Sequence, residues 1–176
     1  MKTVFSLLLC FCSLCMTAQK YGFSSSTDEF TGESIIVSDW QKLSVGFGGN
    51  TYNSYLMLCR IDSSYFLNLK VMTMEVAAVE EGARFMIKME DGEVVTFVNP
   101  QYVLSDRGDG AINFGGSSAM GVHIVLPCES SQITALGAQK IEKCRLEARG
   151  KYYELAPGNK AARNLQEYFL YASQLL

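Results

Sequence analysis

The only histidine of the chain, His123, has the side chain best suited to acid–base or metal chemistry. Either role needs partners, because a zinc site clusters several His or Cys ligands and a hydrolase needs a positioned nucleophile. Beyond residue 19 the sequence has no Cys-x-x-Cys or His-x-x-x-His spacing and no Gly-x-Ser-x-Gly turn. We therefore expect His123 to be a half-buried strand residue, and we predict no catalytic, cofactor-binding or metal-binding residues.

Two acidic residues, Asp106 and Asp109, could offer oxygen atoms to a cation. Asp106 and Asp109 lie among glycines, but residues 106–117 lack the alternating acids and the distal glutamate of an EF-hand loop. The same stretch contains Arg107-Gly108-Asp109, an adhesion tripeptide that also arises by chance. A solvated loop is the interpretation that we favour over calcium binding or adhesion.

Glycine runs and paired carboxylates complete the search for reactive groups. Residues 46–49 and 115–118 are rich in glycine but lack the Gly-Lys-Ser/Thr ending of a phosphate loop, so we expect turns. The pairs Glu80-Glu81 and Glu90-Asp91 are expected at strand ends or turns. Nothing in their spacing holds two carboxylates at the separation that a glycosidase requires.

Tyrosines suggest binding rather than catalysis. The chain has nine, and Tyr152-Tyr153 together with Tyr52 and Tyr55 could form an aromatic platform for a sugar or a protein. The alternative is that they are core and half-buried strand residues, which is the more ordinary role. A single tryptophan makes a sugar-binding platform less favourable.

The first residues have the pattern of a cleavable secretory signal peptide. Lys2 supplies a positive charge, and residues 4–16 form an uncharged, mostly apolar run of 13 residues. That run is shorter than the ~20 residues of a membrane-spanning helix. Ala18 offers a small residue for cleavage, which predicts a signal peptide over residues 1–19. The bulky residues before the leader cysteines argue against lipidation, so we expect no stable membrane anchor.

Cleavage near Ala18 changes the charge and the cysteine content of the remaining chain. The net charge of −3 becomes −4 without Lys2, and no run of five basic residues is present, so we expect no nucleic-acid partner. Cys59, Cys128 and Cys144 remain. In an oxidising compartment either Cys128–Cys144 pairs, the bridge that we prefer, or all three stay as buried thiols.

Apolar periodicity predicts a single β-rich domain over residues 34–176, preceded by a flexible N-terminal arm over residues 20–33. The β-branched stretch 34–43 indicates strand structure. Two apolar runs, 55–61 and 65–71, surround a short polar turn and predict a hairpin. A second hairpin is predicted from residues 141–148 and 151–155, which flank an Arg-Gly turn.

A further hairpin is expected across Asp91-Gly92, a pair that suits a two-residue turn. That register places Phe85, Ile87 and Met89 on one face with the side chains Val94, Thr96 and Val98. A later strand, 122–126, is expected to stop before Pro127. A short helix should follow, capped by Ser130 or Ser131 and ended by Gly137.

The C-terminal segment is predicted to be an amphipathic helix over residues 159–175, with Asn159 as its N-cap. Apolar residues recur there at steps of three and four, so one side of the helix should pack against the sheet. The expected fold class is α+β: a mainly antiparallel β-sheet built from hairpins and packed against this helix.

The segment Asp28-Glu29-Phe30-Thr31-Gly32-Glu33, the Asp-Gly hairpin and the C-terminal helix together resemble small exported proteins of unknown function from Bacteroidetes-type bacteria. The Ala18-Gln19 junction is similar to export signals of the same group. The resemblance implies a Gram-negative envelope location, in the periplasm or outside the cell. We expect a non-enzymatic domain that binds an unknown protein or glycan or acts as an accessory module; the alternative is an extracytoplasmic hydrolase with an unrecognised active site.

Overall fold

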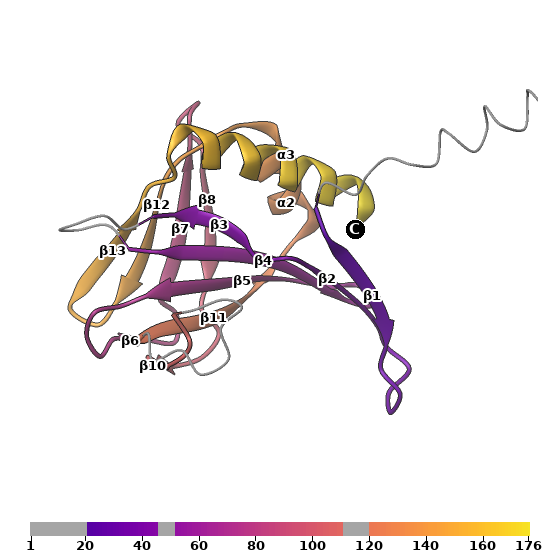
Figure 1. The fold of residues 1–176 in the computed structure, drawn as a ribbon, viewed down its shortest axis with the longest axis horizontal. Coiled ribbons are helices and arrows are strands. Elements are labelled where there is room, and N and C mark those ends of the chain that lie inside the picture. Colours follow the sequence, from indigo (N-terminus) through magenta and orange to yellow (C-terminus); the bar gives the residue numbers. More distant parts are fainter. Residues whose placement is uncertain (1–20, 46–51, 111–119) are drawn as a thin grey trace, which may run out of the picture.

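The computed structural model describes residues 21–45, 52–110 and 120–176. These residues form antiparallel β-sheets and two helices, which confirms the predicted α+β class (Figure 1). The predicted signal peptide, residues 1–19, lies outside the described residues, as do the glycine runs 46–49 and 115–118. No described helix is long and apolar enough to cross a lipid bilayer.

The larger of the sheets, called the large sheet below, begins with a strand that the sequence did not predict. Its strands in spatial order are β1 (Phe23–Thr27), β2 (Ser34–Ser38), β4 (Ser54–Ile61), β5 (Ser64–Met72), β11 (Met120–Cys128) and β10 (Asp106–Arg107), with β3 (Gln41–Ser44) also paired to β4. The predicted hairpin of 55–61 and 65–71 corresponds to β4 and β5 and is confirmed. Its two-residue turn uses a positive φ of 50° at Asp62.

A second sheet, called the small sheet below, crosses behind the large one (Figure 1). It contains β13 (Lys151–Leu155), β12 (Ile141–Ala148), β7 (Arg84–Met89) and β8 (Val94–Val98), and a separate ribbon pairs β6 (Ala78–Val79) with β9 (Val103–Leu104). The predicted hairpin of 141–148 and 151–155 is confirmed as β12 and β13.

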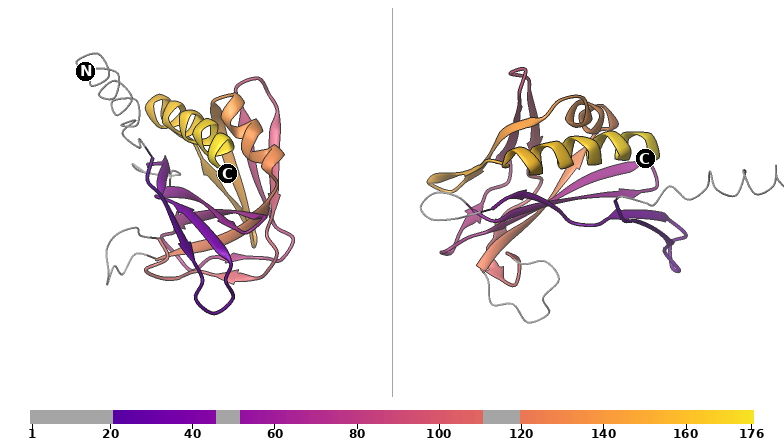
Figure 2. Two further views of the ribbon diagram at one scale, coloured as in Figure 1. Left: turned by 90° about the vertical axis from the view of Figure 1, so that its right-hand side faces the viewer. Right: turned by 45° about the horizontal axis from the view of Figure 1, so that its top comes forward.

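Helices α2 (Ser130–Ala138) and α3 (Asn159–Leu175) pack side by side over one side of the large sheet (Figures 1 and 2). The bounds of α3 agree with the predicted helix 159–175. Its buried side is the predicted apolar stripe, with Leu165, Tyr168 and Phe169 at its centre. The N-cap, however, is Gly158 and not Asn159.

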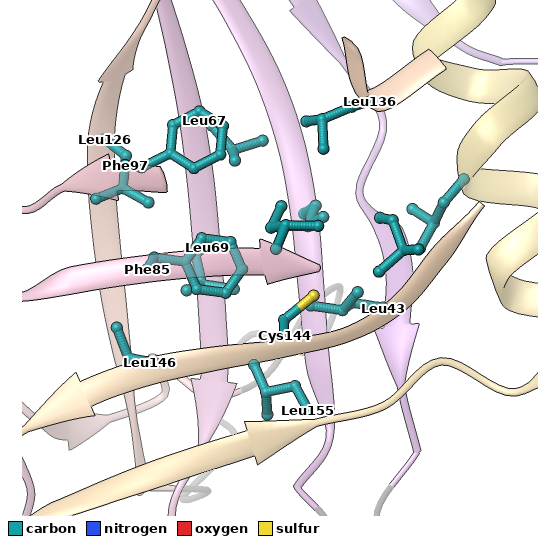
Figure 3. Packing of buried hydrophobic residues seen from close by; sticks show 14 of the residues in the cluster. Leu43, Leu67, Leu69, Phe85, Phe97, Leu126, Leu136, Cys144, Leu146 and Leu155 are labelled. Atoms are coloured by element: carbon teal, nitrogen blue, oxygen red, sulfur yellow. The ribbon is translucent and has the colours of Figure 1, made fainter. Parts of the chain in front are cut away.

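The hydrophobic core fills the space between the two sheets and the helices. Figure 3 shows Leu67, Leu69 and Leu126 of the large sheet meeting Phe85 and Phe97 of the small sheet, with Leu136 of α2 above them. All six side chains are at most 1% exposed. The core therefore lies against one side of the large sheet.

Gly137 does not end the short helix, as the sequence predicted, but allows α2 and α3 to touch. A Cβ at this position would lie 2.7 Å from the backbone nitrogen of Leu170 and 2.9 Å from its Cα. The helix continues to Ala138. Its N-cap is also different: Glu129 takes the place expected for Ser130 or Ser131, and its backbone N–H donates to Gln132 Oε1 at 2.8 Å.

The register predicted for the Asp91-Gly92 hairpin is wrong by one residue. Phe85 pairs with Phe97 and Ile87 pairs with Val95, so these four side chains face the core. The side chains Val94, Thr96 and Val98 face solvent instead. The loop has three residues with Gly92 at φ 93°, and the extra residue exchanges the two faces of β8.

The predicted flexible arm, residues 20–33, is also corrected. Residues 23–27 form β1 and pair along their whole length with β2. Serine and threonine suggested a loop, but small hydroxyl residues are tolerated in an edge strand beside a β-branched partner. Phe23 further fixes the strand by stacking on Tyr168, with ring centroids 6.0 Å apart.

Strand β11 runs through Pro127 to Cys128, two residues beyond its predicted end. Proline lacks the N–H that a central strand would need. Strand β10 pairs only with the first residues of β11, Met120 and Gly121. The segment around Pro127 is therefore paired with β5 on one side and has no ladder partner among the described strands on the other. Proline is tolerated because this is an edge position.

Candidate functional site

The candidate site is the side of the large sheet that faces away from the core, called the outer face below. Side chains alternate along a strand, and residues paired across an antiparallel ladder share a face. Because Leu58, Leu67 and Leu126 point into the core, their sequence neighbours point outward. The outer face carries Ile35, Val37, Tyr55, Met57, Cys59, Ile61, Phe66, Asn68, Lys70, His123, Val125 and Pro127.

Apolar side chains form a continuous row on the outer face. Val37, Cys59, Phe66 and Pro127 align across β2, β4, β5 and β11. Each of these side chains keeps part of its surface exposed. Contiguous exposed apolar surface on a folded domain marks interaction sites. The apolar row therefore has the character of an interaction surface and not of an ordinary solvated sheet face.

The chain leaves the ladder between β2 and β3, at Asp39 and Trp40, and this departure is stabilised by side chains. The backbone N–H of Leu58 donates to Ser38 Oγ and to Tyr168 Oη, each at 3.0 Å. The two hydroxyl oxygens are 2.5 Å apart. These hydroxyls replace the backbone acceptor that the ladder lacks at this point, which keeps a buried N–H satisfied.

Trp40 then lies against the polar end of the outer face. Its ring meets the His123 imidazole edge-to-face with centroids 5.6 Å apart, and Lys70 Nζ lies 5.3 Å from the Trp40 ring centroid. His123 Nε2 is 3.1 Å from Asn68 Oδ1. An amide oxygen only accepts, so Nε2 carries the proton and donates it. The only tryptophan and the only histidine of the chain are thus in direct contact.

The pKa of His123 is lowered from its usual value. Burial is the main cause, because it disfavours the charged imidazolium, and the positive charge of Lys70 adds to it. The carboxylate of Asp109 acts in the opposite direction. The imidazole is therefore neutral at pH 7 and serves as a hydrogen-bond donor on the outer face.

The expectation that His123 is a half-buried strand residue with a local hydrogen bond is confirmed. Its described contacts are with an amide, an indole and an ammonium-bearing side chain, and none of these groups is a nucleophile. Among the residues that the structure describes, no group of three or more His, Cys, Asp or Glu is placed to hold a metal ion.

Other residues singled out in the sequence are dispersed over the molecule. Asp106 and Arg107 form the short strand β10, and Asp109 follows in a turn. Glu80 forms an ion pair with Arg149, and Glu90 forms one with Lys140 at 3.5 Å. These carboxylates therefore balance neighbouring cations on the small-sheet side of the molecule.

The four tyrosines do not form one platform. Tyr52 packs edge-to-face on the buried Tyr153, with centroids 4.8 Å apart. Tyr152 is 58% exposed but lies on the small sheet beside Arg145. Only Tyr55 reaches the outer face of the large sheet. The structure thus separates the residues that a flat sugar-binding platform would need together.

The exposed side of the small sheet has the opposite character to the outer face. Salt bridges connect its strands: Arg84–Glu147 at 2.6 Å, Lys88–Glu142 at 2.6 Å and Arg145–Glu154 at 2.5 Å. On the outer face, by contrast, the aligned rows contain no carboxylate. The chain therefore has one sheet surface made for solvent and one that is largely apolar.

The preferred disulfide between Cys128 and Cys144 is not formed. Both are free thiols, as is Cys59. Cys128 belongs to the large sheet and Cys144 to the buried side of the small sheet, so they are parts of separate layers. Burial raises the pKa of the Cys128 thiol to about 12, which makes it an inert apolar group at neutral pH.

Sequence reasoning missed the outer face, although a signal for it was present. Residues 55–59 are apolar without alternation, and an antiparallel strand with one solvated side should alternate. An unbroken apolar run of this kind indicates that both faces of the strand are apolar. Trp40 could not be placed in the same way, because its position depends on the break between β2 and β3.

In comparisons with known proteins, no protein-family model, no curated protein and no solved structure matches this chain.

Proposed function

We propose that the chain is an exported binding domain that holds a protein partner against the outer face of the large sheet. The observation that carries this proposal is the apolar row Val37, Cys59, Phe66 and Pro127. Trp40 lies on the same face, against Lys70 and His123. Burying such a surface is favourable at ~25 cal/mol per Å² of apolar area. A partner would remove this surface from water.

A protein partner suits the composition of the face better than a glycan does. Its side chains are mainly aliphatic, sulfur-containing and proline residues, with Met57 and Trp40 among the types enriched at protein interfaces. Sugar binding would favour several exposed aromatic rings on one plane. Here the tyrosines are divided between the core and the two sheet surfaces.

Export is part of the proposal and is supported by the sequence. Lys2, the apolar run 4–16 and Ala18 have the order of a cleavable signal peptide. The mature domain would then work in the periplasm or outside the cell. Of its three thiols, only that of Cys59 belongs to the apolar row of the proposed binding surface.

The proposal is tested by photo-crosslinking in cells that express the whole chain. A benzophenone side chain replaces Val125, which lies on the outer face and is 37% exposed. The matched control carries it at Thr96, an exposed residue of the small sheet. We expect one discrete protein adduct from position 125 and none from position 96. Equal labelling at both positions, or no adduct from position 125, would overturn the proposal.

A further inference from the structure

The β1–β2 hairpin ends in an exposed phenyl ring that the fold does not use. Phe30 is 98% exposed. The turn that presents it is well organised: Asp28 Oδ1 accepts hydrogen bonds from the backbone N–H groups of Phe30 and Thr31, both at 2.8 Å. Gly32, at φ 76°, donates to the Asp28 carbonyl at 2.9 Å. The turn therefore displays Phe30 at its tip.

The charges around Phe30 are all negative. Asp28, Glu29 and Glu33 surround it, and residues 21–41 contain no lysine or arginine. Three carboxylates would be repelled by an anionic lipid surface. An apolar pocket with a cationic rim is the complementary surface for this tip.

The chain itself has such a pocket, between β3 and the first turns of α3. Its volume is about 730 Å³, within the range that small ligands occupy. Val45, Ala156 and Ala161 contribute the exposed apolar surface, and Lys42 and Lys160 are exposed lining residues at its edge. Neither lysine forms an ion pair with another described side chain.

The tip and the pocket lie at opposite ends of the molecule. The pocket adjoins the start of α3, whereas the hairpin extends past the other end of that helix (Figure 1). Seventeen residues of helix span about 25 Å. A molecule therefore cannot place Phe30 in its own pocket, but a second copy can.

We propose that the Phe30 tip of one copy inserts into the pocket of the next, with the tip carboxylates facing Lys42 and Lys160. Because the two surfaces differ, the contact is heterologous, and repetition gives a head-to-tail chain or a closed ring. Lys42 pairs with Tyr55 of the outer face, but the contact uses neither Trp40 nor Phe66, so a change at Phe66 tests the proposed function without altering this contact.

Sedimentation velocity of the purified protein over a concentration series tests the contact. We expect reversible self-association that weakens as salt is added, because part of the attraction is electrostatic. Phe30→Ser should weaken association at least about tenfold, since a buried phenyl ring is lost. The matched control is Met74→Ser, which alters a side chain that is 91% exposed elsewhere and should change nothing.

A mixing experiment distinguishes this contact from a symmetric dimer. Phe30→Ser retains the pocket, whereas the double variant Lys42→Glu/Lys160→Glu retains the tip. Each alone should be monomeric, and their mixture should form a complex of two chains that grows no further. Wild-type protein that stays monomeric at millimolar concentration, Phe30→Ser that associates like wild type, or a mixture that stays monomeric would each overturn the proposal. Circular dichroism verifies that every variant is folded, and Phe66→Ser on the outer face should self-associate normally.

Discussion

Ser38 and Tyr168 together satisfy one buried backbone group, and this predicts a specific pattern of stability losses. Tyr168→Phe removes one acceptor of the Leu58 N–H but leaves Ser38 Oγ at 3.0 Å. Ser38→Ala leaves the tyrosine oxygen at the same distance. Each single change should lower the free energy of unfolding by about 1 kcal/mol, the net worth of one hydrogen bond.

The double variant should lose clearly more than either single change. Without both hydroxyls the Leu58 N–H is buried with no acceptor, and such a group costs about 1–3 kcal/mol. Each single change also breaks the Ser38 Oγ–Tyr168 Oη hydrogen bond, which a sum of the two single losses would count twice. We therefore expect the double variant to lose about 1–3 kcal/mol beyond either single variant. Urea unfolding followed by circular dichroism measures all four free energies.

A double variant as stable as the single variants would refute the reasoning, because it would mean that Leu58 finds another acceptor when both hydroxyls are absent. The result also bears on the binding surface. The Ser38–Tyr168 pair closes the ladder at the point where β2 and β3 separate, and Trp40 lies in that separation. That result would therefore question the position of Trp40 on the outer face.

Five further outcomes are expected. Protonation of His123 should quench Trp40 fluorescence with a midpoint below the usual histidine pKa of about 6.5, and His123→Gln should abolish the transition. Because folding lowers the pKa of His123, the stability that the neutral imidazole contributes is present above pH ~6.5. This stability is lost as the pH falls through the folded-state pKa. Urea unfolding at several pH values measures the loss. Gly137→Ala should lower the free energy of unfolding by about 1–2 kcal/mol, since crowding against the α3 backbone outweighs the gain in helix propensity. Intact mass should show that Cys144 resists alkylation in the folded protein and that all three thiols react, without reductant, after denaturation. N-terminal sequencing of exported protein should begin at Gln19.

Local patterns in the sequence predicted the elements whose signals are strong. The helix over residues 159–175 has one apolar stripe, and the Arg149-Gly150 turn needs only two residues, so both were predicted with their bounds. Both depend on contacts close in sequence. The fold class followed because hairpins and a single amphipathic helix leave few alternatives.

Features that depend on distant contacts were missed. The Asp91-Gly92 loop takes one more residue than the dipeptide suggests, and this exchanged the faces of β8. Gly137 appeared to be a helix stop because its contact with Leu170 lies 33 positions away along the chain. The outer face needed the pairing of four strands before its apolar row was visible.

Emission from Trp40 tests the central claim, that the outer face of the large sheet binds a protein, most directly. Trp40 is the only tryptophan of the chain. If the tryptophans of the partner are replaced by a spectrally distinct analogue, the Trp40 emission of the complex reports on this face alone. The partner is the protein that is crosslinked at position 125, purified with the analogue in place of its tryptophans. Its addition to this domain should shift the Trp40 emission to shorter wavelength and protect Trp40 from acrylamide quenching. A complex that forms while the Trp40 emission and its quenching stay unchanged would contradict the claim.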